Sequence, residues 1–212
     1  MAAQVGLRAR KKELTRQQIF DAARRLFAQR GFDAVTVAEI ARDANVSEVT
    51  VFNYFPSKED LFYGGMQFFE ERLLEAVRTR PRGESAIKAL RRCLLESADG
   101  LQSRERIDAI LRAAEIVSAS PSLMAREREL VERYTRRLAV LLAEETDADP
   151  WDVEPMTAAG ALIGAHRAVV DYVRRRVLAG RRGAALVEDA RVQIRRAYAR
   201  LDSGLGGYAV RT

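Results

Sequence analysis

The sequence is poor in the residues that build most enzyme and metal sites. Its 212 residues include one cysteine, Cys93, and one histidine, His166. A single cysteine excludes a disulfide within the chain and a cysteine-rich metal cluster, and it is typical of a reducing compartment. Cys93 with one distant histidine makes no credible nucleophile site, so we interpret Cys93 as a small core residue and His166 as an ordinary helix residue. We therefore predict no catalytic site, no metal site and no cofactor.

Long apolar runs and phosphate-binding loops are also missing. The longest uncharged run, "PMTAAGALIGAH", is far shorter than the roughly 20 apolar residues of a membrane-spanning helix. The N-terminus has no apolar signal core. No GxxxxGK[ST] pattern occurs, and the "GLGG" near the C-terminus follows no strand pattern. These absences predict a cytoplasmic protein that has no membrane partner.

Charge is unevenly distributed along the chain. The formal net charge is +6 and the isoelectric point is near 9.8, which permits a polyanionic partner. Between Met1 and Phe20 the only acid is Glu13, whereas the basic residues are Arg8, Arg10, Lys11, Lys12 and Arg16. We predict that residues 1–13 form a basic flexible arm that tracks a phosphate backbone. A solvated, disordered start explains the same residues equally well.

Hydrophobic periodicity predicts helices throughout the chain, and no strand pattern competes. Thr15 with Gln18 forms a capping-box pattern ahead of a first helix, and Gly31 follows that helix at the C′ position. Thr36 repeats the capping pattern for a second, short helix. Ser47 caps a third helix, which ends near Phe55.

Longer helices are expected beyond Pro56. We predict one continuous helix from Ser57 to about Arg78, followed by helices at 85–102, 104–118, 121–146, 151–179 and 184–202. The result is an all-α, nine-helix, two-domain protein. Residues 14–60 would form a three-helix domain and residues 61–202 a second helical domain, followed by a flexible tail at 203–212.

Residues 36–62 contain the pattern of a helix-turn-helix. Ala41 is small where two helices must touch, Asn45 tolerates the left-handed conformation of the turn, and Val51 can lock the second helix. Helical spacing then turns a largely polar set outward: Glu48, Val49, Thr50, Asn53 and Tyr54. Such side chains suit base edges and phosphates in a major groove. Taken alone, the spacing fits an ordinary helical hairpin about as well.

The surrounding residues favour DNA binding. The stretch "RGFDAVTVAEIARDANVSEVTVFNYFPSKEDLF" closely resembles the N-terminal domain of TetR-type bacterial repressors. The resemblance implies phosphate or base contacts from Thr36, Thr50, Tyr54 and Lys58. Phe52 stands where the family usually has a tyrosine, so one phosphate contact is missing or Phe52 only packs. The DNA-contact set that we predict is Thr36, Ser47, Glu48, Val49, Thr50, Asn53, Tyr54 and Lys58, with Arg8, Arg10, Lys11 and Lys12 of the arm.

Glu48 has two interpretations. It stands at a position that reads bases in some relatives, and a carboxylate can accept a hydrogen bond from cytosine N4. Alternatively, its negative charge complements the N-terminus of the helix that it begins.

The same resemblance implies a C-terminal domain that binds a ligand and forms a homodimer through its last two helices. The segment "MTAAGALIGAHRAVVDYV" is rich in small residues, which permit close helix approach. We predict that the dimer interface contains Ala159, Ile163, Gly164, Val170, Val173, Ala190, Ile194, Ala197 and Tyr198. Packing inside the chain's own core is the alternative explanation of these apolar stripes.

An effector site is expected between the long helix from Ser57 and the helices of residues 85–146. Its predicted residues are Met66, Phe69, Leu94, Ile110, Met124 and Tyr134, with Arg112 and Arg126 holding an acidic end, as in a fatty acyl compound. Our interpretation is a ligand-responsive repressor that binds a near-palindromic operator as a homodimer and is released by a small, largely apolar molecule. The alternative is a helical sensor or scaffold dimer whose helix-turn-helix is vestigial and non-specific.

Overall fold

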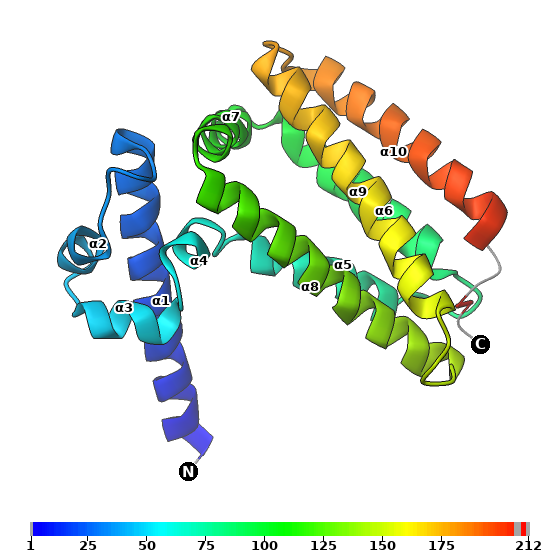
Figure 1. Cartoon of the computed structure of the whole chain (residues 1–212), viewed down its shortest axis with the longest axis horizontal. Coiled ribbons are helices and arrows are strands. Elements are labelled where there is room, and N and C mark those ends of the chain that lie inside the picture. Colours follow the sequence, from blue (N-terminus) through cyan, green and yellow to red (C-terminus); the bar gives the residue numbers. More distant parts are fainter. Residues whose placement is uncertain (1, 206–208, 211–212) are drawn as a thin grey trace. The chain divides into compact units, whose positions relative to one another are not determined.

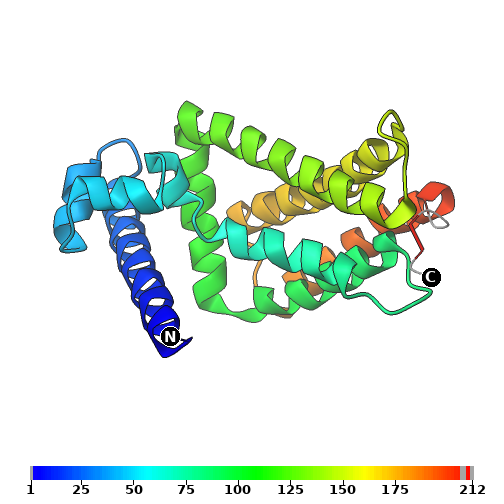
Figure 2. The same ribbon diagram turned by 90° about the horizontal axis from the view of Figure 1, so that it is seen from below.

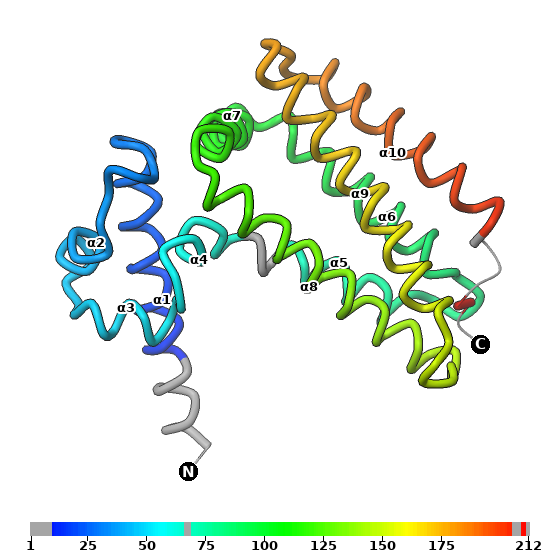
Figure 3. The backbone as a smooth tube through the Cα atoms, viewed as in Figure 1, coloured from blue at the N-terminus to red at the C-terminus, as the bar shows by residue number. Residues whose placement is uncertain are grey.

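The computed structural model describes the backbone of residues 2–205 and 209–210, and the side chains of residues 10–65, 69–204 and 209–210. In this part of the chain there are ten α-helices and one short 3-10 helix, whose course is drawn in Figures 1 and 3. The all-α prediction is confirmed. No helix in the described ranges combines the length and apolarity needed to cross a bilayer.

The chain divides into two compact units. The first consists of Met1–Gln67 with Ile116–Met124, and the second of Phe68–Glu115 with Ala125–Thr212. The first unit holds α1 (Ala2–Arg30), α2 (Val37–Asp43), α3 (Glu48–Tyr54) and α4 (Lys58–Phe62). The second holds all or most of α5 (Met66–Arg78), α6 (Ala86–Ala98), η1 (Asp99–Gln102), α7 (Arg104–Ala119), α8 (Pro121–Thr146), α9 (Glu154–Leu178) and α10 (Gly183–Leu205).

The first helix begins earlier than the sequence predicts. Thr15 lies inside α1, where its hydroxyl donates to the Lys11 carbonyl oxygen at 3.0 Å, so it is not an N-cap. The preceding lysines, Glu13 and Leu14 are good helix formers, and nothing among them stops a helix. The helix therefore continues through Thr15 instead of beginning there, because adding a residue to an existing helix is favourable.

The predicted continuous helix from Ser57 to Arg78 is wrong. The chain forms α4 and then α5, separated at Tyr63–Gly65. A Cβ added to Gly64 would lie 2.9 Å from Phe20 Cδ2 and 3.0 Å from Phe55 Cε1. Gly64 thus allows the backbone to approach the core aromatics closely, and two successive glycines weaken the helix at this point.

The end of α7 and the start of α8 pack in the first unit. Leu123 is fully buried there, and its carbonyl oxygen accepts a hydrogen bond from the Tyr63 hydroxyl at 3.0 Å. Ser120 donates to Asp33 at 3.4 Å. Residues 116–124, distant in sequence, therefore complete the unit that contains the helix-turn-helix. The predicted domain of residues 14–60 does not include them.

The core of the second unit lies among α5, α6, α8, α9 and α10. Figures 1 and 2 show α9 running beside α10, and α10 also packs against α6. The Tyr198 hydroxyl, buried in this core, donates to the Leu162 carbonyl oxygen at 3.2 Å. The predicted flexible tail needs a correction at residues 209–210: Arg80 Nη2 donates to the Ala209 carbonyl oxygen at 2.8 Å, and Val210 forms an antiparallel bridge with Ser85.

Candidate nucleic-acid interface

A capping box fixes the start of α2. The Thr36 backbone N–H donates to Glu39 Oε2 at 2.8 Å, and the Glu39 N–H donates to the Thr36 hydroxyl at 3.2 Å. Arg30 also donates to Glu39 Oε1 at 2.7 Å. These contacts, the Thr36 N–H first, lower the pKa of Glu39 to about 2. Thr36 is exposed, so the residue predicted as the helix cap is also accessible from outside.

The turn between α2 and α3 adopts the predicted conformation. Asn45 has a φ of 52°, in the left-handed region. The Val46 N–H donates to the Ala41 carbonyl oxygen at 2.9 Å, and the Asn45 N–H to the Arg42 carbonyl oxygen at 3.1 Å. This pair of bonds satisfies the last carbonyls of α2 and directs the chain into α3.

The recognition helix, α3, is anchored at its start and on its inner face. Ser47 caps it by accepting from the Thr50 N–H at 3.1 Å, and the Ser47 and Thr50 hydroxyl oxygens lie 2.8 Å apart. Val51 and Phe55 are buried, with exposed fractions of 0% and 2%. Two buried side chains therefore set the rotation of the whole helix about its axis.

The outer face of α3 is accessible. Ser47, Glu48, Val49 and Asn53 are exposed, and Thr50 and Tyr54 are half-buried. The sequence predicted that Phe52 either packs against the protein or leaves one phosphate contact missing. In the structure Phe52 is 47% exposed. The exposed Phe52 belongs to the same surface as the polar residues, and only the resolved rotation of the helix reveals this.

Lys58 is held close to the protein rather than extended into solvent. It is half-buried, and its ammonium nitrogen lies 4.3 Å from the centroid of the Phe32 ring. Arg10, Lys11 and Lys12 are exposed on α1. The side chain of Arg8 lies outside the described residues.

The predicted effector residues do not gather around one cavity. Within the described residues, a small cavity of about 10 Å³ is lined by Glu70, Leu73, Leu74, Leu90, Tyr134, Leu138 and Ile163, so Tyr134 is the single residue of the predicted effector set in its wall. Leu94, Phe69 and Ile110 pack in or against the core. Arg112 is exposed and Arg126 pairs with Glu129 of its own helix at 2.6 Å, and neither arginine lines this cavity.

Two further members of the predicted effector set fall elsewhere. Met124 belongs to the first unit and is 38% exposed. The Met66 side chain lies outside the described residues. The apolar periodicity of a helix identifies a buried stripe, but it does not distinguish a cavity wall from a filled core.

The surface that lines the cavity is apolar, although Glu70 and Tyr134 belong to its wall. Glu70 is 3% exposed, and its carboxylate is 2.5 Å from Arg137 Nη1 and 3.6 Å from Arg133 Nη2. The Tyr134 hydroxyl oxygen is buried and has no hydrogen-bond partner among the described residues. Burial, with a smaller contribution from Glu70, raises the pKa of Tyr134. The phenol is therefore a neutral donor and acceptor whose hydrogen-bonding capacity is unused.

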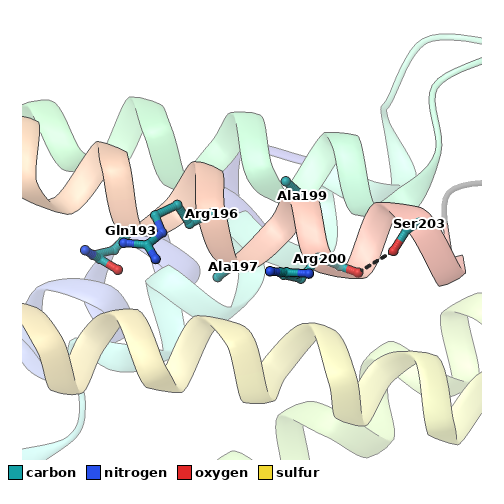
Figure 4. A pocket seen from close by; sticks show the side chains of 6 residues that line it. All are labelled: Gln193, Arg196, Ala197, Ala199, Arg200 and Ser203. Atoms are coloured by element: carbon teal, nitrogen blue, oxygen red, sulfur yellow. Dashed lines mark hydrogen bonds between the residues drawn. The ribbon is translucent and has the colours of Figure 1, made fainter.

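Most of the predicted dimer interface lies inside the chain's own core, which corrects that prediction. Five of its residues are at most 5% exposed: Ala159, Ile163, Ala190, Ile194 and Tyr198. Val170, Val173 and Ala197 are half-buried, and Gly164 is exposed with no atom within 4 Å of an added Cβ. One surface of α10 carries Gln193, Arg196, Ala197, Ala199, Arg200 and Ser203 (Figure 4), of which only Ala197 belongs to the predicted set.

His166 packs as a core aromatic. Its ring centroid lies 5.2 Å from that of Phe69. Burial, followed by the positive charges of Arg167 and Arg174, lowers its pKa to about 4. Among the described side chains no group of three or more potential ligands could hold a metal ion.

Comparisons with known proteins agree with this architecture. Residues 19–63 match the family described as bacterial regulatory proteins, tetR family, and residues 84–199 match the MftR C-terminal domain. The HTH-type transcriptional regulator TcmR of Streptomyces glaucescens is 33% identical over 150 residues, which cover 68% of this chain and 66% of TcmR. A regulator named MftR from Mycobacterium tuberculosis is 27% identical over 160 residues, covering 73% of this chain and 77% of MftR.

Solved structures share the fold. NalD, the secondary repressor of the MexAB-OprM multidrug efflux pump in Pseudomonas aeruginosa, superposes with a TM-score of 0.58 at 20% identity, covering 89% of this chain and 96% of NalD. FadR from Bacillus subtilis has a TM-score of 0.54 at 20% identity, covering 86% of this chain and 97% of FadR. The first family match thus falls in the first unit, and the second falls mostly in the second unit. The chain belongs to the TetR family of bacterial transcriptional regulators.

Proposed function

We propose that this protein is a ligand-responsive repressor that binds a near-palindromic operator as a homodimer. The rotation of α3 carries the proposal: Val51 and Phe55 are buried, while Ser47, Glu48 and Asn53 face outward. A helix whose inner face is locked can present hydrogen-bonding groups to base edges in a fixed geometry. Arg10, Lys11 and Lys12, exposed on α1, supply positive charge for phosphates.

A symmetric operator requires a symmetric protein. Two recognition helices must lie about one turn of DNA apart, roughly 34–36 Å, or a multiple of that distance. Met156, Gly160 and Gly164 are exposed at intervals of four residues along α9, so they form one outward strip. The two glycines would allow a helix of a second copy to approach closely. We place the dimer contact on this strip and on the outward face of α10.

The effector that we propose is a largely apolar molecule with one hydrogen-bonding group. Aliphatic side chains form most of the cavity wall, and the buried, unpaired Tyr134 hydroxyl would supply the hydrogen bond once the wall opens around a ligand. The cavity encloses only about 10 Å³, far below the roughly 300–1,000 Å³ of most small-molecule sites, so binding would require the surrounding side chains to move apart. SmeT with triclosan and FadR with stearoyl-CoA are complexes of the same fold.

The same cavity offers a route for the response. Its wall includes residues of α5 and α8, and each of these helices contains residues of both compact units. A ligand that shifts these helices would therefore act on the DNA-binding unit through continuous backbone. Release requires that the ligand bind the DNA-incompetent state more tightly, because equal affinity for both states shifts nothing.

DNA binding is tested by an electrophoretic shift assay with the duplex that flanks the protein's own gene, over a series of salt concentrations. We expect specific binding that weakens as the salt concentration rises, and we expect unrelated DNA to be a poor competitor. Binding without sequence preference at every salt concentration would support the alternative, a sensor or scaffold dimer with a vestigial helix-turn-helix. The exposed Phe52, which lacks the hydroxyl usual in the family, is the observation behind that alternative.

The effector is tested by titrating apolar carboxylates and acyl thioesters into the protein–operator complex. Tyr134→Phe should raise the concentration needed for release about five-fold, since one hydrogen bond is lost. Tyr172→Phe on α9 is the matched control, because Tyr172 lies outside the cavity wall. Release by polar sugars alone would reject the proposed ligand chemistry.

A further inference from the structure

Two apolar side chains on the recognition helix, α3, are exposed to solvent. Val49 is 70% exposed and Phe52 is 47% exposed, whereas Val51 and Phe55 of the same segment are almost fully buried. Val49 and Phe52 are three residues apart, so they lie on one side of α3 together with Asn53. Exposed apolar side chains next to hydrogen-bonding groups are a feature of surfaces that recognise a partner.

The neighbouring polar groups are partly committed to the helix itself. Thr50 donates its N–H to the Ser47 oxygen, and the two hydroxyl oxygens are 2.8 Å apart. These two residues therefore use part of their hydrogen-bonding capacity to start α3. Glu48 and Val49 are the exposed first-turn side chains that make no such bond, and Val49 is the apolar one of the two. First-turn residues of a recognition helix are those that meet base edges.

Among the groups in the major groove, the one complementary to an apolar side chain is the C5-methyl of thymine. Valine in a helix keeps one preferred rotamer, so little side-chain freedom is lost when it makes this contact. Phe52 cannot donate to a phosphate, but its ring can cover a methyl group one turn further along. We propose that Val49 and Phe52 form a thymine-methyl reader, so that each half-site carries thymines selected by their C5-methyl groups. This inference rests on the proposed DNA-binding function.

The experiment replaces thymine by deoxyuridine, which removes the C5-methyl and leaves all hydrogen-bonding groups in place. The full-length protein first selects duplexes from a random pool. Each thymine of the selected duplex is then replaced singly, and the dissociation constant is measured. For the wild type we expect uracil to weaken the affinity about four-fold at the one position in each half-site that Val49 contacts, as for one buried methyl group. We expect a similar loss of affinity at the neighbouring position that Phe52 contacts.

The variants assign each position to a side chain. Val49→Ala should bind the thymine duplex less tightly and no longer distinguish thymine from uracil at its position, while Phe52→Ala should lose the discrimination at the other. Val140→Ala is the matched control, because Val140 is 57% exposed on α8. It should retain both preferences. Thermal unfolding of each variant checks that the fold is retained.

The outcomes separate this inference from the function on which it rests. If the pool yields no preferred sequence, the proposed function fails. If a sequence is preferred but the uridine scan of the wild type is flat, the methyl reader is rejected and the repressor function stands. The thymine-methyl reader is also rejected if both alanine variants keep the wild-type discrimination between thymine and uracil.

Discussion

Lys58, which we propose as a phosphate contact, packs against an aromatic ring of its own chain. Its ammonium nitrogen lies 4.3 Å from the Phe32 ring centroid, a geometry that holds the charge near the end of α3 and the start of α4. Such a contact contributes about 0.5–1 kcal/mol at a partly exposed site. A preorganised cation loses less freedom when it meets a phosphate than an extended lysine does.

Lys58→Ala should therefore weaken binding to specific and unrelated DNA alike and reduce the slope of log K against log salt by about one. The measurement is a salt series on both duplexes. Lys88→Ala on α6, an exposed lysine of the other unit, is the control and should leave both slopes unchanged. Loss of specific binding alone would show that Lys58 reads bases instead.

His166 gives the stability a pH dependence at the residue scale. Its pKa is about 4 in the fold, whereas the ordinary value for histidine is 6.5, so the unfolded chain binds more protons between these values. The contribution is fully present above pH 6.5 and is lost as the pH falls towards 4. We expect the free energy of unfolding to drop by about 2 kcal/mol between pH 7 and pH 5 through this residue.

Denaturant unfolding of the wild type and of His166→Gln at pH 7 and pH 5 measures this contribution. The variant should lose stability at pH 7, because it changes the contact with Phe69. Between pH 7 and pH 5, the free energy of unfolding of His166→Gln should fall by about 2 kcal/mol less than that of the wild type. An equal pH dependence in both proteins would assign the effect to other groups.

At the scale of elements, the turn between α2 and α3 depends on one backbone conformation. Asn45 has a φ of 52°, which glycine adopts freely and alanine adopts at a cost of about 1 kcal/mol or more. Asn45→Ala should therefore lower the free energy of unfolding by about that amount, while Asn45→Gly should leave it nearly unchanged. Chemical denaturation of the three proteins compares them, and equal losses for both substitutions would assign the role to the asparagine side chain.

The break between α4 and α5 is a second test at this scale. Gly64→Ala places a methyl group within 3.0 Å of the Phe20 and Phe55 rings, so we expect a loss of about 1–3 kcal/mol from overpacking. Gly204→Ala is the matched control, because nothing lies within 4 Å of its added Cβ. That variant should be neutral or slightly stabilised in thermal unfolding. Equal unfolding temperatures for the two variants would contradict the close approach at Gly64.

At the scale of the whole molecule, the proposed dimer makes Gly164 informative. This residue is exposed, and an added Cβ meets no atom within 4 Å, so a larger side chain fits the single chain. Gly164→Leu should nevertheless weaken self-association, because it separates two closely packed helices. Analytical ultracentrifugation over a range of concentrations measures the dimer dissociation constant.

Lys88→Leu, at an exposed position of α6, should leave self-association unchanged and serves as the control. A wild-type protein that sediments as a monomer at all concentrations would refute the dimeric arrangement. An unchanged dimer in Gly164→Leu would instead move the interface to another surface of the chain.

The sequence by itself determined the elements that depend on local chemistry. The capping box at Thr36, the cap at Ser47, Asn45 in the turn and the inward phase of Val51 and Phe55 follow from a few neighbouring residues. The helix-turn-helix and the family could therefore be predicted from residues 30–62. The helical class was predictable for the same reason, since 3.6-residue periodicity runs along the chain. None of these features needs a contact between distant segments.

Tertiary structure alone decided which apolar stripe faces which neighbour. Ile163 and Tyr198 satisfy the periodicity of an interface, yet their positions lie in the core of their own chain, because α10 packs against both α9 and α6. The same limitation hid the cavity at Tyr134 and the helix break imposed at Gly64 by Phe20 and Phe55. Periodicity records that a face is buried, but the partner that buries it is set by packing between segments far apart in sequence.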